Sequence, residues 1–397
     1  MIFPSVYFFL AAIACWFGIQ SLLGGIRFAA YVRRETSLPL PDFQPLVSVI
    51  APARGLEPGL AENLRTLLTQ DYPQYEVIFV FDSGNDPALK IVEQLKKTSL
   101  VSVRTIIAGP ATDSGQKVHN LRVAVTQVDP KTEVLVFVDS DARPENSWLK
   151  KLVAPLADET LGASSGYRWF VPQKGGIASR LRGVWNASIA SALGTDMTKN
   201  FCWGGSTAIR RTTFDRLNVS ERWRGTVSDD FTITRVLKEA NQPIHFTPHC
   251  LVPSVGDCDF KELFEFTTRQ IKITRVYAPQ LWLPLLLGSA LFTIVFFGGL
   301  IALLVRPSYN LLIALTILYA LGASKAFIRW RAITIPLEVY RSAMLRDLPA
   351  HLILWPFASV LYLYNAVVAG LSRRIDWRGI RYELKSPNEA VIISRDS

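Results

Sequence analysis

Long apolar runs constrain the fold of this chain more than any other feature. A helix of roughly 20 apolar residues is long enough to cross the hydrocarbon core of a bilayer. Four such runs lie at residues 2–30, 281–305, about 309–327 and about 348–371. Arg27, Arg33 and Arg34 lie at or just beyond the end of the first run. Because positive residues collect on the cytoplasmic side, we expect an integral, multi-pass membrane protein whose following domain is cytoplasmic.

The charges around the C-terminal runs do not give one consistent topology. The basic residues within 325–346 are typical of a cytoplasmic segment, and so are those that follow residue 371. Three full C-terminal crossings would place that last segment outside. We therefore expect one run to be re-entrant or interfacial, unless the tail breaks the rule. Residues 335–348 have the pattern of an amphipathic helix that lies on the membrane.

Charge and cysteine content narrow the class of partner. The formal net charge is +10, which suits nucleic acid, an anionic membrane surface or an anionic small substrate. Arginines beside apolar runs favour the lipid bilayer, so we expect no nucleic-acid partner. The four cysteines include no Cys-x-x-Cys pair, which argues against a zinc site and against a disulfide framework.

Between about residues 45 and 275, short β-branched runs alternate with helical patterns. The clearest strand-like runs are PLVSVIAPA, YEVIFVFDS and EVLVFVDSD. The alternation predicts an α/β domain with a parallel sheet and helices on both faces. Such sheets bind ligands beyond the carboxyl ends of their strands. Asp82, Asp139 and Asp141 lie at those ends.

The segment EVLVFVDSDARP places two carboxylates, Asp139 and Asp141, directly after a strand that should be buried. A turn there could bring both onto one cation. Hard divalent cations prefer oxygen ligands, and Mg²⁺ is commonly shared between one or two carboxylates and substrate phosphates. We therefore predict that Asp139 and Asp141 bind Mg²⁺ or Mn²⁺ together with a nucleotide diphosphate. The alternative for each is an ordinary solvated turn acid.

A second acidic pair, Asp229 and Asp230, precedes the helical pattern TITRVLKEA. An aspartate at the cap or in the first turn stabilises a helix, which accounts for one of the two. A carboxyl in a dry cleft, or beside another carboxylate, has a raised pKa and suits a general base. The spacing favours neither alternative. Two roles are likewise open for Asp82 and Asp86: one of them could hydrogen-bond the nucleoside, or either could be an ordinary turn acid.

Taken together, these segments resemble family 2-type glycosyltransferases with a GT-A fold, and most closely the ceramide glucosyltransferase branch, family 21. The similar segments are VSVIAPARGLEPGLAENLRTLLTQDYPQYEV, FDSGNDPA, SGQKVHNL, VFVDSDARP, FCWGGSTAIRR, VSDDF and IDWRGIRYEL. They cover nearly the whole chain and occur in the family's order. That combination is far more specific than any one motif.

The resemblance implies roles for individual residues. It implies Asp230 as the catalytic base, with Gly204, Gly205 and Asp229 on the acceptor side. The donor-binding residues that it implies are Pro52, Arg54, Asp82, Asp86, Lys117, Asp139, Arg269 and Lys272. From the residues alone, position 117 is equally compatible with a solvated loop lysine.

One motif departs from the family pattern. The family's (Gln/Arg)-x-x-Arg-Trp element falls here in FTTRQIKITRVYAP, where Arg269 and Lys272 fit the basic positions and Ile273 replaces Trp. In the family this element holds the diphosphate and shapes the acceptor entrance, so the change bears on donor positioning and acceptor choice. The alternative explanation for these charges is a basic face at the membrane surface.

The resemblance implies an inverting hexosyltransferase of glycolipid biosynthesis. It would move a hexose, with UDP-glucose as the expected donor, onto the hydroxyl of a membrane lipid such as ceramide, as in sphingolipid metabolism. Diacylglycerol and a hopanoid are alternative acceptors, and a processive polysaccharide synthase or a non-enzymatic membrane scaffold is an alternative function. We expect an N-terminal transmembrane helix (1–34), a cytoplasmic GT-A domain (45–277), C-terminal transmembrane or interfacial helices (278–372) and a basic tail (373–397).

Overall fold

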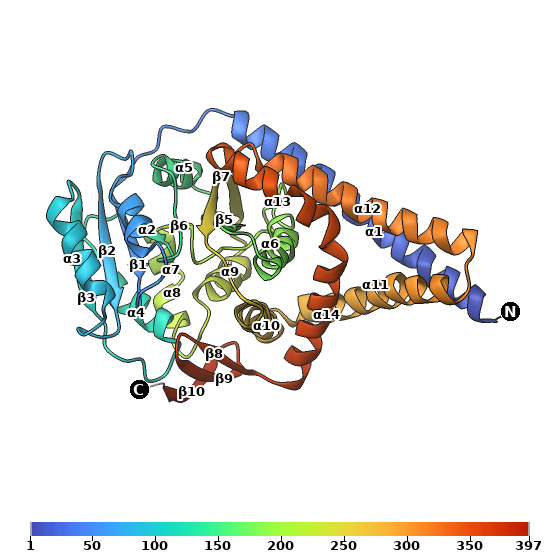
Figure 1. Cartoon of the computed structure of the whole chain (residues 1–397). Helices are drawn as coiled ribbons and strands as arrows, with labels where there is room; N and C mark the ends of the chain where they lie inside the picture. Colours follow the sequence, from blue (N-terminus) through green and yellow to red (C-terminus); the bar gives the residue numbers. More distant parts are fainter. Residues whose placement is uncertain (1, 396–397) are drawn as a thin grey trace. The chain divides into compact units, whose positions relative to one another are not determined.

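The computed structural model describes residues 2–395, and the chain forms two compact units. The first, called here the sheet unit, contains Glu35–Phe170, Leu193–Val255 and Arg373–Ser397. The second, the helical unit, contains Met1–Arg34, Val171–Ala192 and Gly256–Ser372. Each unit is therefore assembled from segments that lie far apart in the sequence, and Figure 1 follows the chain through them.

The sheet unit is built on a seven-stranded mixed sheet of order β3-β2-β1-β4-β6-β5-β7 (Figure 1). Its strands are β1 Val47–Pro52, β2 Tyr75–Phe81, β3 Ser102–Ile107, β4 Val134–Phe137, β5 Ala163–Val171, β6 Thr207–Arg210 and β7 Ile244–Val255. Strand β1 pairs in parallel with β2 and β4, whereas β6 is antiparallel to β4 and β5. The carboxyl ends of β1, β2 and β4 therefore meet at one edge of the sheet. The predicted α/β class is confirmed.

The central strands are continuous apolar runs because both of their faces are buried. Every residue of β2 and of β4 is buried, which is the pattern that parallel strands show when helices cover a sheet. The helices of this unit are α2 Leu60–Leu67, α3 Ala88–Thr98, α4 Gln116–Val125, α5 Trp148–Val153, η1 Ala154–Ala157, α7 Arg211–Arg216, α8 Val219–Arg222 and α9 Asp229–Glu239.

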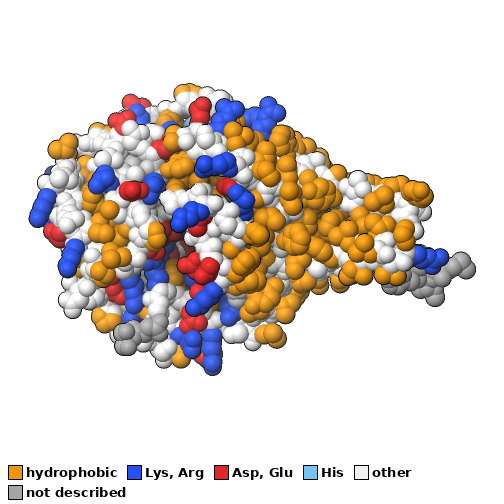
Figure 2. Space-filling view, viewed as in Figure 1, with side chains coloured by type: hydrophobic (Ala, Val, Ile, Leu, Met, Phe, Trp, Pro, Cys, Tyr) orange, Lys and Arg blue, Asp and Glu red, His pale blue; other side chains and the backbone are white. Residues whose placement is uncertain are grey.

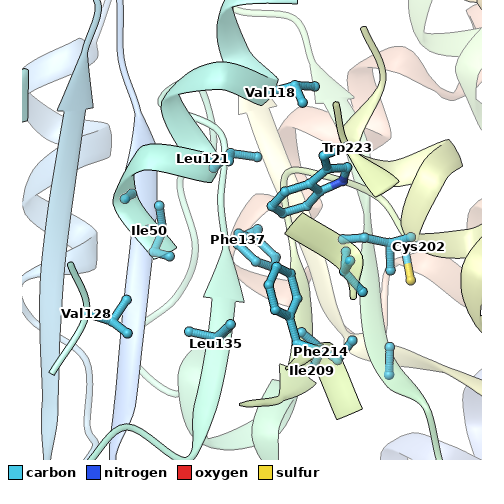
Figure 3. Packing of buried hydrophobic residues seen from close by; sticks show 14 of the residues in the cluster. Ile50, Val118, Leu121, Val128, Leu135, Phe137, Cys202, Ile209, Phe214 and Trp223 are labelled. Atoms are coloured by element: carbon cyan, nitrogen blue, oxygen red, sulfur yellow. The ribbon is translucent and has the colours of Figure 1, made fainter. Parts of the chain in front are cut away.

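An aromatic cluster packs against the end of β4 (Figure 3). The ring of Phe137 lies 6.1 Å from that of Phe214 and 5.4 Å from that of Trp223, centroid to centroid. All three rings are buried, and Leu121 of α4 belongs to the same core. The indole N–H of Trp223 donates to the main-chain carbonyl of Asp229 at 3.1 Å. The cluster therefore holds the start of α9 as well as the end of β4.

The segment predicted as a basic tail contains a second, three-stranded antiparallel sheet of order β10-β9-β8. Its strands are β8 Arg374–Trp377, β9 Ile380–Ser386 and β10 Glu389–Arg395. Arg378 and Gly379 join β8 to β9 with φ angles of 50° and 71°, as in a tight two-residue hairpin turn. Along β9 the side chains of Ile380, Tyr382 and Leu384 are buried, and residues between them are more exposed. One face of this small sheet therefore packs inward.

Three helices in the described part of the chain are long and apolar enough to cross a membrane. These spans are Ser5–Ser37, Pro279–Val305 and Tyr309–Ile333. They belong to α1 Ile2–Ser37, α11 Pro279–Val305 and α12 Tyr309–Ile333. Figure 2 shows hydrophobic side chains covering these helices. The other helices outside the sheet unit are α6 Ile177–Ala190, α10 Phe260–Tyr277, η2 Glu338–Tyr340, α13 Arg341–Ile353 and α14 Trp355–Leu371.

The last apolar run is broken. The stretches Glu338–Ile353 and Trp355–Leu371 meet at a bend of 70°. Together they pass the same test of length and hydropathy, and would be a fourth span if counted as one. A bend of this size suits either a broken span or a re-entrant loop. A re-entrant loop would agree with the basic charge of the last segment, whereas a broken span would be a third C-terminal crossing and would keep the conflict.

Truncation of Trp223 tests the aromatic cluster. Trp223→Ala removes a fully buried ring and its hydrogen bond, so we expect the free energy of unfolding to fall by about 3–5 kcal/mol. The measurement is the midpoint of thermal unfolding in detergent. Trp223→Phe refills most of the cavity and should cost less. Leu100→Ala, at a fully exposed position, is the control, and an equal shift in both alanine variants would contradict this packing.

Candidate active site

Two acidic side chains follow β4 at the carboxyl edge of the sheet. The N–H of Val138 donates to the carbonyl of Ile50 at 3.1 Å, and the chain then turns, with the N–H of Ala142 donating to the carbonyl of Asp139 at 3.1 Å. The side chains of Asp139 and Asp141 are 22% and 35% exposed. The structure therefore places both carboxylates where ligands bind to sheets of this kind.

Lys117 lies in the first turn of α4 and pairs with two carboxylates. Its Nζ is 2.7 Å from Asp139 Oδ1 and 3.1 Å from Asp229 Oδ1, and only 16% of its side chain is exposed. Burial would lower the pKa of Lys117, but Asp139, Asp229 and Asp230 outweigh it and raise that pKa above its ordinary value. Lys117 is therefore a buried cation, and the alternative of a solvated loop lysine is wrong.

Arg168 on β5 contacts both carboxylates of the acidic turn, although the sequence analysis did not select it. Its Nη2 is 3.3 Å from Asp139 Oδ2 and 3.1 Å from Asp141 Oδ2. The guanidinium also lies 5.2 Å from the centroid of the Trp203 ring, a favourable cation–π arrangement. The missed signal is a single charge within the apolar strand ASSGYRWFV, because a buried charge requires partners.

These two cations set the charge state of Asp139. Burial alone would raise the pKa of its carboxyl group, but Lys117 and Arg168 outweigh burial and hold the pKa below its ordinary value. One carboxylate oxygen pairs with Lys117 and the other with Arg168. Asp139 is therefore an ionised group whose orientation is fixed from both sides.

The second acidic pair lies at the start of α9, and neither aspartate is its N-cap. Ser228 is the N-cap, and its side chain accepts the N–H of Phe231. Asp230 accepts the N–H of Gly204 at 3.4 Å through Oδ2 and that of Phe231 at 2.7 Å through Oδ1. Asp229 is 2% exposed, whereas Asp230 is partly exposed. The first turn of α9 therefore buries one carboxyl and leaves the other accessible beside the Gly204 loop.

Asp229 is a buried carboxyl with a displaced pKa. Burial is the main cause, and Asp230 and Asp139 add to it, so the pKa rises to about 6 even though Lys117 opposes the shift. Its Oδ2 has no hydrogen-bond partner among residues 2–395. A Cβ at Gly204 would lie 2.3 Å from this oxygen, so only glycine lets the loop approach this closely.

Gly205 is required for a related reason. A Cβ there would lie 2.2 Å from the ring of Trp203, whose side chain is nearly buried against Arg168. Close packing of the loop therefore accounts for both glycines. Their acceptor-side role remains a prediction.

The loop after β1 is tied to the end of β2. Pro52 ends β1, and Arg54 Nε lies 3.5 Å from Asp82 Oδ2. Asp86 accepts the N–H of Gly55 at 2.9 Å and a second N–H at the start of α3 at 2.8 Å. The carboxylate of Asp86 therefore anchors this loop. The donor-binding roles of these residues remain predictions.

Glu57 follows in the same loop, although the sequence analysis did not select it. Its carboxylate pairs with Arg378. Burial raises the pKa of Glu57, with Arg378 opposing the shift and Asp141 and Asp139 adding to it. Glu57 therefore lies within electrostatic reach of the acidic turn.

The basic pair predicted to hold the diphosphate belongs to the helical unit. Arg269 and Lys272 are both on α10, and the guanidinium of Arg269 lies 5.8 Å from the centroid of the Phe266 ring. Ile273, which stands where the family has Trp, is 4% exposed. It is therefore a buried residue, and the role of the basic pair in donor binding remains a prediction.

The acidic turn offers hard oxygen ligands of the kind that divalent cations prefer. Among the described residues, no group of three or more His, Cys, Asp or Glu side chains is placed to hold a metal ion. Asp139 and Asp141 would therefore supply two ligands and leave the others to phosphate and water, as Mg²⁺ sites commonly do. The residues present fit such an ion, but Arg168 contacts the same oxygens and would compete with it.

The sequence profile of glycosyl transferase family 21 matches residues 6–390, nearly the whole chain. This chain belongs to that family. The match confirms the resemblance drawn from the order of the motifs.

Individual relatives of this family 21 chain match over shorter stretches. It is 32% identical over 94 residues to ceramide glucosyltransferase 3 of Caenorhabditis elegans, which is 23% of this chain and 19% of that protein. It is 29% identical over 110 residues to a hyaluronan synthase of Streptococcus pyogenes, which is 28% of this chain and 26% of that protein. The matches therefore span about a fifth to a quarter of these relatives.

A solved structure is also similar to the family 21 chain. It is a mannosyltransferase from Pyrobaculum calidifontis, in complex with GDP-Man and Mn²⁺. The sequences are 19% identical, the TM-score is 0.48, and the comparison covers 91% of this chain and 99% of the mannosyltransferase.

The raised pKa of Asp229 predicts how stability depends on pH. Between about pH 4 and pH 6 the folded chain keeps a proton that the unfolded chain has lost, so stability falls as pH rises. Asp229→Asn removes this dependence. The difference in free energy of unfolding between Asp229→Asn and the wild type should therefore shift in favour of the variant by up to about 3 kcal/mol as the pH rises from 4 to 7. Thermal unfolding across this range measures the difference, and a constant difference would contradict the assignment.

Because Arg168 competes with a metal ion, we expect that loss of this arginine strengthens metal binding. Arg168→Gln frees Asp139 Oδ2 and the carboxylate of Asp141, so Mn²⁺ binding in the absence of donor should become several-fold tighter. Electron paramagnetic resonance of free Mn²⁺ measures this without any assay of activity. Arg143→Gln, which breaks the ion pair with Glu62, is the matched control. Unchanged Mn²⁺ affinity in Arg168→Gln would show that no ion binds at the acidic turn.

Proposed function

We propose that this chain is a membrane-bound, inverting glycosyltransferase that moves a hexose from a nucleotide diphosphate sugar to the hydroxyl of a membrane lipid. The observation that carries the proposal is the Lys117 bridge, because it joins the acidic turn to the start of α9. A donor side and an acceptor side thereby lie within one cluster. Membership of family 21 supports the type of reaction.

The acidic turn is proposed as the donor side. Asp139 and Asp141 would hold Mg²⁺ or Mn²⁺, which when bound neutralises charge on the leaving diphosphate. Lys117 adds a fixed cation at the same place, and Arg168, which the ion would displace from the shared oxygens, adds a second. Groups oriented before the reaction stabilise developing charge without having to reorganise, so Lys117 would favour departure of the diphosphate.

Asp230 is proposed as the general base. Its carboxylate is partly exposed beside the Gly204 loop, whereas Asp229 is buried and paired with Lys117. Asp230 would take the proton of the acceptor hydroxyl as its oxygen bonds to the anomeric carbon. The bond from that carbon to the diphosphate breaks in the same displacement, so the configuration inverts.

The apolar helices support a lipid acceptor. An acceptor hydroxyl anchored in the bilayer suits an enzyme whose own chain can cross that bilayer at three or four places. We infer a multi-pass protein with its sheet unit on the cytoplasmic side, where nucleotide sugars and the basic flanks of the helices belong. UDP-glucose and ceramide are the proposed donor and acceptor, with support from the similarity to ceramide glucosyltransferases.

A processive polysaccharide synthase is the second candidate. The similarity to a hyaluronan synthase over 110 residues favours it. Such an enzyme is expected to carry an intact Gln-x-x-Arg-Trp motif and more spans that form a channel. Three or at most four candidate spans among residues 2–395 favour transfer to a lipid, whereas Ile273 in place of Trp departs from both patterns.

Labelled products test the reaction and name the acceptor. Membranes of a host that expresses this chain, supplied with labelled UDP-glucose and separate lipid classes, should yield a labelled glycolipid on thin-layer chromatography. Asp139→Ala and Asp230→Asn should each abolish transfer in a protein that stays folded. Asp230→Asn should keep an unfolding temperature close to that of the wild type, whereas Asp139→Ala removes a partner of Lys117 and Arg168 and should lower it. EDTA should stop the reaction, and Mg²⁺ or Mn²⁺ should restore it.

Each outcome of this experiment removes a different part of the proposal. Label found only in a long polymer would favour the synthase. Full turnover by Asp230→Asn would show that this residue is not the base. Transfer in the presence of EDTA would show that the reaction does not depend on a metal ion. Glu159→Gln, a charge-neutralising change at an exposed acid, is the control and should keep full activity.

A further inference from the structure

The proposed mechanism assigns no role to the C-terminal sheet, β8–β10. Its first turn is formed by Arg378 and Gly379, both with positive φ. Turns of this type favour Asn, Asp or Gly at their first position, and positive φ is uncommon for other residues. The backbone conformation here is therefore unfavourable for an arginine, which indicates that its side chain has a function.

Arg378 reaches the loop that follows β1, at the carboxyl edge of the main sheet. Its Nη1 donates to the carbonyl of Arg54 at 2.7 Å, and its Nη2 pairs with the carboxylate of Glu57. Glu57 is in turn within electrostatic reach of Asp141 and Asp139. The β8–β9 turn therefore brings a cation within electrostatic reach of Asp139, but pairs it with Glu57, a carboxylate outside the acidic turn.

Tyr382 ties the same small sheet to the start of α4. Its hydroxyl, on a side chain 2% exposed, accepts the N–H of Gln116 at 3.1 Å. Gln116 begins the helix, where backbone N–H groups have no partner within the helix itself. Arg395 of β10 adds a hydrogen bond to Gln116 Oε1 at 3.1 Å. The small sheet thereby fixes the helical turn from which Lys117 pairs with Asp139.

A third contact joins this sheet to the segment before α9. Gly225 has a φ of 76°, and a Cβ there would lie 2.2 Å from the carbonyl oxygen of Asn388. Arg235 of α9 donates to the side-chain oxygen of the same Asn388. The small sheet therefore contacts the loop after β1, the start of α4 and the region of α9, which together carry the proposed site.

We propose that the C-terminal sheet is part of the donor site, and that Arg378 binds the diphosphate by exchanging the Glu57 carboxylate for phosphate oxygens. This rests on the proposed function, because it takes the donor to be a nucleotide diphosphate sugar. A guanidinium presents a fork of N–H groups that suits carboxylate and phosphate alike. Tyr382 acts as a positioning residue, through the start of α4.

Binding of UDP and of uridine separates recognition of phosphate from recognition of the nucleoside. The probe is a fluorescent UDP analogue, displaced by either ligand from the full chain in detergent with Mn²⁺. Arg378→Ala should weaken UDP binding by about tenfold or more, since hydrogen bonds to charged groups are among the stronger ones, and should leave uridine binding unchanged. Arg381→Ala, the same loss of charge on β9 beside Asp376, should bind UDP as the wild type does.

Glu57→Gln distinguishes an exchange of partners from an ion pair that only fastens the sheet. If Glu57 competes with phosphate for Arg378, its neutralisation should make UDP binding several-fold tighter. If the pair is only structural, UDP binding and the unfolding temperature should fall together. That result, or wild-type UDP affinity in Arg378→Ala, would overturn the proposal.

The wild-type chain separates this inference from the proposed function. A wild type that binds no nucleoside diphosphate would overturn both. A wild type that binds UDP and transfers sugar, with Arg378→Ala equal to it in UDP affinity, would overturn the inference alone. Tyr382→Phe, which keeps the ring, should lower kcat/KM for the donor several-fold and leave KM for the lipid unchanged. An unchanged kcat/KM for the donor would remove Tyr382 from its positioning role.

Discussion

The ammonium group of Lys117 is the point at which three separate segments of this chain are tied together. Its partners follow β4 and begin α9, and the lysine itself lies in the first turn of α4. A charge removed from water is tolerated only when partners and hydrogen bonds replace that water, and loss of one partner leaves an uncompensated charge. The positions of Asp139 and Asp229 therefore depend on each other through Lys117, although they come from different elements.

Asp139 receives a second cation, Arg168, on its other oxygen, and this arrangement explains how the cluster is stable before any ligand binds. Each carboxylate of the acidic turn already has a positive partner. A divalent ion on the same oxygens would displace Arg168, and the displaced guanidinium would then be available to a phosphate group. In the proposed function, the cluster therefore binds its donor by exchanging partners rather than by exposing unpaired charge.

The sequence was sufficient to place the acidic turn and insufficient to assign α9. Asp139 could be predicted because VLVFV is apolar at every position, which predicts a buried strand with its ligand-binding end at the next residue. Asp229 and Asp230 could not be separated by spacing alone. Which of them is buried depends on Gly204 and Lys117, which are distant in sequence. Ser228 as the cap removes one alternative for the pair, but a base role for Asp230 still rests on the family resemblance.

The residues that the sequence analysis missed share one physical property. Arg168, Glu57 and Arg378 lie in segments whose local pattern indicates only a strand, a loop and a turn, and their partners come from elsewhere in the chain. Such pairings depend on tertiary contacts, so the hydrophobic periodicity of the sequence cannot predict them. Two local conflicts were nevertheless readable, a charge within an apolar strand and an arginine before the glycine of a hairpin turn. Each marks a place where local preference is overruled by a distant partner, and both partners lie at the carboxyl edge of the same sheet.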